Sequence, residues 1–286
     1  MQNTDKLFRE AEKSVLNNEL QSAFEMLGNR AEETGSMLVK EELDSEKRIY
    51  RQMLEFTFKG AEDPQRTEIL RKMKIKLLAL NDRLRETVLR ADPSSVLNNE
   101  KENFLKEALS RQENIEALSS NYTNAERDER AETFRRLFSL IWFTDSLSEA
   151  ESLSLQKLIR NSRTEFYEKS QVVSALILSV LRYFDLKKFE LHLDAYDSNI
   201  KNIWNRAFVG LIIACYLYNE RLPLYKNLTA RFKVIADDAG IENYLKLVIF
   251  QLIRTRETEK ISEKLRDEII PEMSKYRPKI EEKLDL

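Results

Sequence analysis

Apolar residues recur at spacings of three and four along most of this 286-residue chain, which is the period of an amphipathic helix. The N-terminal segment shows the pattern twice, on either side of a short polar turn at residues 17–18. Its apolar positions are Leu7, Phe8, Ala11 and Val15 before the turn and Leu20, Ala23, Phe24 and Leu27 after it. Two helices joined by so short a turn lie antiparallel. The pattern therefore predicts a helical hairpin that ends at Gly28 or Gly35, since glycine favours the left-handed conformation found at helix ends.

Two longer helices are predicted next. The third spans about residues 44–59, with Ile49, Met53 and Phe56 facing the core. The fourth spans about residues 64–91 and begins with a proline, which the first turn of a helix tolerates. Its single apolar stripe consists of Ile69, Met73, Leu77, Leu80, Leu84 and Val88.

The chain is predicted to comprise three regions. Helical hairpins occupy residues 1–91, and Pro93 then disfavours helix at Asp92. Residues 92–131 are dense in charge and thin in large apolar side chains, which predicts a polar, mobile connector with two exposed helices. Residues 132–286 form a C-terminal array. Its helices are predicted at about 147–161, 164–183, 186–196, 199–219, 222–238, 241–254, 257–270 and 272–284, after an apolar stripe at 134–141.

The most apolar stretches are too short to cross a membrane. Residues 170–181 and 207–219 carry no formal charge, but a spanning helix needs about 20 predominantly apolar residues. We therefore expect two enclosed helices of a protein core and no membrane span.

Composition favours helices over sheet. Glycine and proline number five each, and no segment alternates convincingly at period two. The 34-residue tetratricopeptide consensus does not recur at a constant period. The expected fold is all-α, an irregular α-solenoid of antiparallel helical hairpins, with a compact multi-helix bundle as the alternative.

Charge and rare residues narrow the functional classes. Lysine and arginine total 47 against 49 acidic residues, a balance that does not favour general nucleic-acid binding. Cys215 is the only cysteine and His192 the only histidine, too few for a usual zinc site or a disulfide. Glycine-rich phosphate loops and a Gly-x-Ser-x-Gly elbow are also missing from the sequence. The sequence therefore nominates no catalytic, cofactor-binding or metal-ligating residue, and no cofactor is expected.

Aromatic residues are the remaining candidates, because Trp, Tyr and Arg are favoured where proteins bind one another. The same helical spacing also fits ordinary packing between helices. The candidate protein-interaction residues are Trp142, Trp204, Arg206, Tyr216, Tyr218 and Tyr225.

Several segments resemble a family of long, uncharacterised bacterial helical-repeat proteins of tetratricopeptide-like α-solenoid type. They are FKGAEDPQR (58–66), SALILSVLRYFDLKKF (174–189), WNRAFVGLIIACYLY (204–218) and TEKISEKLRDEIIPEM (258–273). Members of that family are longer, so the resemblance implies that this chain is an N-terminal portion. It also implies a solenoid fold and an intracellular, cytoplasmic location, but no catalytic or binding residues.

Three functional hypotheses follow. The leading one is a non-enzymatic scaffold that binds a protein or peptide, including the missing C-terminal part of its own chain. The alternative is a nucleic-acid-binding helical-repeat protein, which requires basic residues collected on one face. The third is an enzyme with a carboxylate-based site, which requires a deep pocket with carboxylates of raised pKa.

Overall fold

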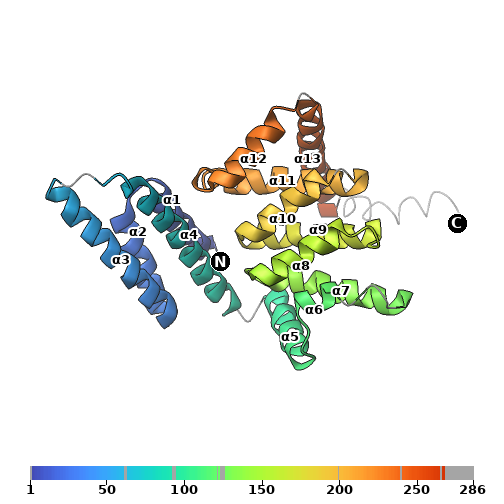
Figure 1. Ribbon diagram of the computed structural model, residues 1–286, viewed down its shortest axis with the longest axis horizontal. Helices are drawn as coiled ribbons and strands as arrows, with labels where there is room; N and C mark the ends of the chain where they lie inside the picture. The colour runs from blue at the N-terminus through green and yellow to red at the C-terminus, as the bar shows by residue number, and fades with distance from the viewer. Residues whose placement is uncertain are drawn as a thin grey trace, which may run out of the picture. The chain divides into compact units, whose positions relative to one another are not determined.

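The computed structural model describes residues 2–60, 63–91, 95–120, 122, 126–198, 200–238, 240–264 and 266–267. These residues form helices joined by short turns, with no strand among them, so the fold is all-α as expected (Figure 1). The chain divides into two units between Leu228 and Thr229. Within the described ranges, every helix is too short or too polar to cross a bilayer.

The first four helices share one apolar core. They are α1 (Gln2–Leu16), α2 (Leu20–Glu33), α3 (Met37–Phe58) and α4 (Arg66–Arg90), and α1 packs against both α2 and α4. The core includes Phe8, Ala11, Val15, Leu20, Phe24, Leu27, Met73, Leu77, Leu80 and Leu84. The predicted N-terminal hairpin and the apolar stripe of the fourth helix are thus confirmed, except that Leu7, predicted on the apolar face, is exposed. Gly35, two residues after the end of α2, has a φ of 64°, whereas Gly28 lies inside that helix.

The inward face predicted for the third helix was wrong. Ile49 and Phe56 are exposed, and the buried face instead carries Val39, Leu43 and Glu46. Helix α3 begins at Met37, before the predicted start near residue 44. The true stripe therefore begins in a segment that was not assigned to the helix, and its spacing of four and three selects a different face.

Four helices follow the gap at residues 92–94. They are α5 (Val96–Ser110), α6 (Ile115–Ser120), α7 (Arg127–Phe143) and α8 (Glu149–Arg160). The region predicted to be a polar connector includes α5 and α6, and it is not uniformly exposed. Ala108, Ile115 and Tyr122 are buried, and α6 packs against α7 and α8. These few apolar residues attach the segment to the following helices.

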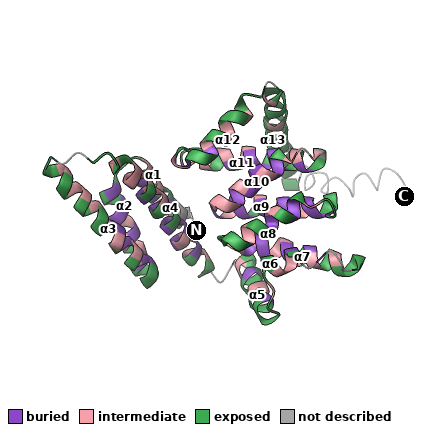
Figure 2. Ribbon diagram, viewed as in Figure 1, coloured by how far each residue is buried: buried purple, intermediate pink, exposed green. Residues whose placement is uncertain are grey.

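Helix α9 (Phe166–Arg182) is the enclosed centre of the next group. It packs against α7, α8, α10 (Leu186–Asp197) and α11 (Lys201–Tyr218), and Figure 2 shows its many buried and half-buried residues. The uncharged stretches at 170–181 and 207–219 are therefore helices of a protein core. At Gly210 a Cβ atom would lie only 2.5 Å from Cγ1 of Ile177, so glycine permits the close approach of α11 to α9.

The chain continues through the short 3-10 helix η2 (Leu222–Leu224) and α12 (Lys226–Ala236) to α13 (Ile241–Lys264). One continuous helix thus replaces the two predicted at 241–254 and 257–270. Unlike α9, α13 is exposed along nearly its whole described length (Figure 2). The helix predicted at 272–284 lies outside the described residues.

Candidate functional site

Arg221 joins the first helical group to the turn after α11. Its guanidinium donates from Nη1 to Oδ2 of Asp82 at 2.6 Å and from Nη2 to Oδ1 at 3.0 Å, and it also pairs with Glu12. Asp82 lies on α4 and Glu12 on α1. Arg221 is only 4% exposed, so this two-pronged ion pair is buried. One side chain therefore holds together segments 139 and 209 residues apart in the sequence.

Aromatic rings surround this ion pair. The Arg221 guanidinium carbon lies 5.5 Å from the ring centre of Tyr218 and 6.0 Å from that of Phe184. The Phe184 ring centre is 5.0 Å from the ring centres of both Tyr218 and Tyr225. The Tyr218 hydroxyl donates to the carbonyl of Val180 at 2.7 Å. The structure thus brings two of the predicted interaction residues together, but as packing around Arg221.

Burial shapes the ionisation of these groups. It raises the pKa of Asp82, and the charge and hydrogen bonds of Arg221 oppose that shift. Burial by itself would lower the pKa of Arg221, but the Asp82 and Glu12 carboxylates outweigh it and raise that pKa further. Burial also raises the pKa of Tyr225 to about 12. Arg221 therefore stays cationic at neutral pH, and Tyr225 stays neutral.

A cleft of about 610 Å³ opens beside Arg221. It is lined by Phe8, Arg9, Glu12 and Lys13 of α1, Asn81, Asp82 and Arg85 of α4, Leu181 and Arg182 of α9, Phe184, and residues 216–221. Tyr216 is 81% exposed, and its neighbour Leu217 is also exposed. Arg9 and Lys13 are exposed on the α1 side. The cleft therefore combines an exposed aromatic residue, an exposed aliphatic residue and exposed cations with the buried ion pair.

A second buried charge cluster secures the C-terminal end of α7. The Lys188 ammonium is fully buried and lies 3.2 Å from the carbonyl oxygen of Ile141 and 2.6 Å from Oγ of Ser179, and it also contacts the Thr144 carbonyl. Burial lowers its pKa to about 8. A cation at this position satisfies carbonyls that a helix end leaves without partners. We assign Lys188 a structural role, because it is sealed from solvent.

Asp145 connects this cluster to the rest of the unit. Its carboxylate accepts from Lys101 at 2.9 Å and lies 2.8 Å from Nη2 of Arg182. Burial opposes its ionisation, but Lys101 and Arg182 outweigh burial and lower the pKa of Asp145. Glu86 lies 2.8 Å from Nη1 of Arg182. The Arg182 side chain thus links this network to the lining of the cleft.

The other predicted interaction residues do not line the cleft. Trp142 stacks on Phe143, with ring centres 4.9 Å apart. Trp204 stacks on Phe208 at 5.3 Å. Arg206 is exposed on α11.

Burial shifts the pKa values of the single histidine and the single cysteine away from their reactive ranges. His192 is buried, its Nε2 lies 2.9 Å from the Ala207 carbonyl oxygen, and burial lowers its pKa to about 4. Burial raises the pKa of the Cys215 thiol to about 12, which disfavours the reactive thiolate. The described part of the chain brings no three His, Cys, Asp or Glu side chains into a metal-binding group.

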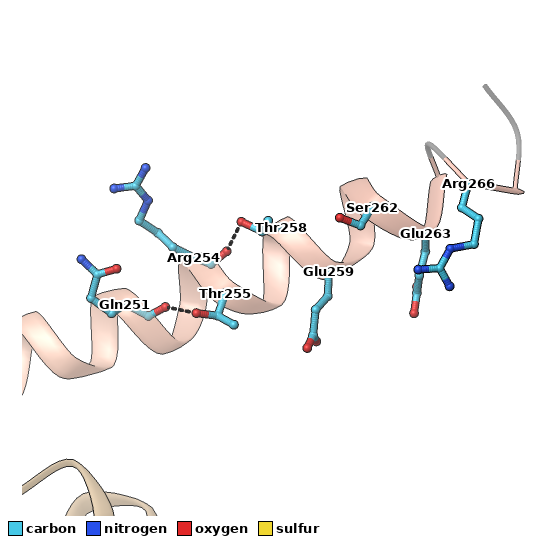
Figure 3. A pocket seen from close by; sticks show the side chains of 8 residues that line it. All are labelled: Gln251, Arg254, Thr255, Thr258, Glu259, Ser262, Glu263 and Arg266. Carbon is cyan, nitrogen blue, oxygen red and sulfur yellow. Dashed lines mark hydrogen bonds between the residues drawn. The ribbon is translucent and has the colours of Figure 1, made fainter. Parts of the chain in front are cut away.

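A polar hollow on α13 is a weaker candidate than the cleft. Figure 3 shows that its lining side chains all belong to residues 251–266. The hydroxyls of Thr255 and Thr258 donate back to helix carbonyls, both at 2.9 Å. Among the described residues no second segment faces the hollow, so its polar groups do not converge on a common point.

Sequence reasoning missed the residues that organise the cleft: Glu12, Asp82, Phe184 and Arg221. The only local sign was the turn sequence NERLPLY around Arg221, since no pattern in the chain marks its distant partners. Comparisons with protein-family models, curated proteins and solved structures found no match.

Proposed function

We propose that this protein is a non-enzymatic scaffold that binds a protein or peptide partner in the cleft beside Arg221. The observation that carries the proposal is the placement of Tyr216 and Leu217, two exposed apolar residues on a rigid base. Tyr218, two positions further along, is anchored beneath them by its hydrogen bond to Val180. Tyrosine provides a large contact area at low entropic cost, because its side chain has only two rotatable bonds, so the exposed Tyr216 is suited to partner contact.

The wider architecture supports the same proposal. Consecutive helices pack as neighbours in the pairs α1 and α2, α2 and α3, and α10 and α11. Such successive packing is typical of α-solenoids, which present extended surfaces to other proteins. We include an irregular, tetratricopeptide-like solenoid in the proposal. The single cysteine is compatible with a reducing, cytoplasmic compartment.

Site-specific photo-crosslinking tests the proposal. A benzoylphenylalanine replaces Tyr216 in the full chain, and irradiation in native cells should yield a discrete protein adduct. The matched control places the same group at Tyr167, which is also exposed but lies near the other end of α9 from the cleft. The expected result is an adduct from position 216 that position 167 does not give.

A second variant separates a specific site from a generally adhesive surface. Replacing Leu217 with Ala in the photo-reactive chain should reduce the adduct, because Leu217 is the neighbouring exposed apolar contact. Equal adducts from both positions, or an adduct that nuclease removes, would contradict a protein-binding cleft.

A further inference from the structure

Helix α13 exposes an unusually apolar surface. Tyr244, Leu245, Leu247, Ile249, Phe250, Leu252 and Ile253 are all substantially exposed within ten residues. Soluble proteins seldom leave contiguous apolar surface of this kind uncovered, and where they do it usually marks an interaction site. On one face of the helix, the apolar and charged residues recur at a regular spacing, and this spacing indicates what kind of partner would cover it.

That face carries Glu242, Leu245, Ile249, Leu252 and Arg256, at spacings of three, four, three and four. This is the heptad period with which helices pair along a straight seam. All five residues are exposed. The seam has three aliphatic residues at its centre, an acidic residue at one end and a basic residue at the other.

This order is self-complementary when the helix meets an antiparallel copy of itself. A twofold axis through Ile249 places the two Ile249 side chains against each other and brings Leu252 of the second copy to within one residue's rise, about 1.5 Å, of the level of Leu245. The same axis places Glu242 opposite Arg256, and the symmetry repeats this pair. Within the described residues, Arg256 has no ion-pair partner in its own chain, so its guanidinium is available to a carboxylate of a second copy.

We propose that two copies of this chain associate through an antiparallel, twofold pairing of α13, with Ile249 at the axis and Glu242 paired with Arg256 at each end. Apolar contact along the seam provides the attraction, and the two terminal ion pairs select the antiparallel register. A parallel pairing would instead set like charges opposite each other.

Sedimentation velocity on the full chain tests the proposal, at concentrations from roughly 1 to 100 µM, where modest interfaces dissociate. Wild-type protein should shift toward twice the monomer mass as concentration rises. Ile249→Asp should abolish the shift, because it sets two carboxylates against each other at the axis. Leu247→Asp is the matched control, since Leu247 is 55% exposed against 44% for Ile249 but lies on the opposite face of the helix. This control should still dimerise.

Charge reversal tests the register. Glu242→Arg replaces two attractions with two repulsions and should weaken dimerisation by about tenfold, or about 1.4 kcal/mol. Combining it with Arg256→Glu should restore the dissociation constant to within about threefold of wild type. Glu242 also pairs with Lys246 of its own helix at 2.6 Å, and the second reversal does not restore that pair, so recovery isolates the contact between copies.

Two outcomes would overturn the proposal. The first is a wild-type chain that stays monomeric throughout the concentration range. The second is dimerisation that Ile249→Asp leaves intact or that the double reversal fails to restore. None of these residues lines the cleft, so either outcome leaves the proposed binding function untouched.

Discussion

Removing the Arg221 guanidinium should loosen α1–α4 from the helices that follow. Arg221→Met keeps most of the apolar stem and deletes the charge, which leaves Asp82 buried without its partner. Breaking a buried ion pair in this way costs about 3–5 kcal/mol. The double change Asp82→Leu with Arg221→Met should cost clearly less, because apolar replacement of both partners leaves no isolated charge.

The positions of the tryptophans allow the unfolding of α1–α4 to be distinguished from the unfolding of the helices that follow. Trp142 and Trp204 are the only tryptophans, on α7 and α11, so their fluorescence does not report directly on α1–α4. Far-ultraviolet circular dichroism reports on all helices. In urea titrations, Arg221→Met should move the dichroism midpoint below the fluorescence midpoint, and the separation should exceed that of the wild type. The N-terminal group then unfolds before the tryptophan-bearing group.

Arg206→Met is the control for this experiment. Arg206 is exposed and, among the residues that the structure describes, donates only to Oγ of Ser174, at 2.7 Å, so its loss should change stability by less than about 0.5 kcal/mol. The reasoning about Arg221 is refuted if Arg221→Met loses less than about 1 kcal/mol, which is the value of an exposed pair. An equal shift of the dichroism and fluorescence midpoints would refute the idea that Arg221 joins α1–α4 to the helices that follow.

Four further substitutions test packing, the burial of His192 and helix capping. Gly210→Ala should lose about 1–3 kcal/mol in urea unfolding because its Cβ would collide with Ile177, whereas Gly28→Ala, with open space around it, should gain up to about 1 kcal/mol. Burial holds the pKa of His192 near 4 against 6.5 unfolded, so the unfolded chain binds the extra proton between those values. The contribution of neutral His192 to the free energy of unfolding is therefore complete above pH 6.5 and falls by about 3 kcal/mol as the pH drops to 4. His192→Gln should lack this dependence of stability on pH. Ser148→Ala should lose about 1 kcal/mol in a thermal melt by removing a helix cap.

Local patterns in the sequence predicted most helices and much of the core. Apolar spacing identified the buried stripe of α4, and Ser148 and Glu151, three residues apart, form a capping box at the start of α8. Asp185 likewise caps α10, where its side chain accepts from the backbone N–H of Lys188. These signals succeed because both partners lie within a few residues of each other. The face of α3 was mispredicted because its first turn was not recognised as helix.

The cleft could not be predicted in the same way. Charged residues make up 34% of the chain, so the pairing of Arg221 with Asp82 is one of very many possible combinations. Tyr216 and Tyr218 looked equivalent in the sequence. Side chains two positions apart on a helix point in nearly opposite directions. Tyr216 is therefore exposed in the cleft, while Tyr218 packs under Arg221. Only the position of α11 against its neighbours decides which is which.

The buried charges also link stability to the proposed binding. Arg221 and its partners on α1 and α4 hold together the elements that line the cleft, so the cleft has its full lining only while that ion pair is formed. A partner that contacts both sides of the cleft must therefore stabilise the junction by mass action. Conversely, Arg221→Met should raise the apparent dissociation constant of the partner, because only molecules with a closed junction bind it. This effect adds to the loss of any direct contact with Arg221. Partner affinity and the separation of the two unfolding midpoints should then change together across variants of this ion pair, which a purely superficial binding surface would not produce.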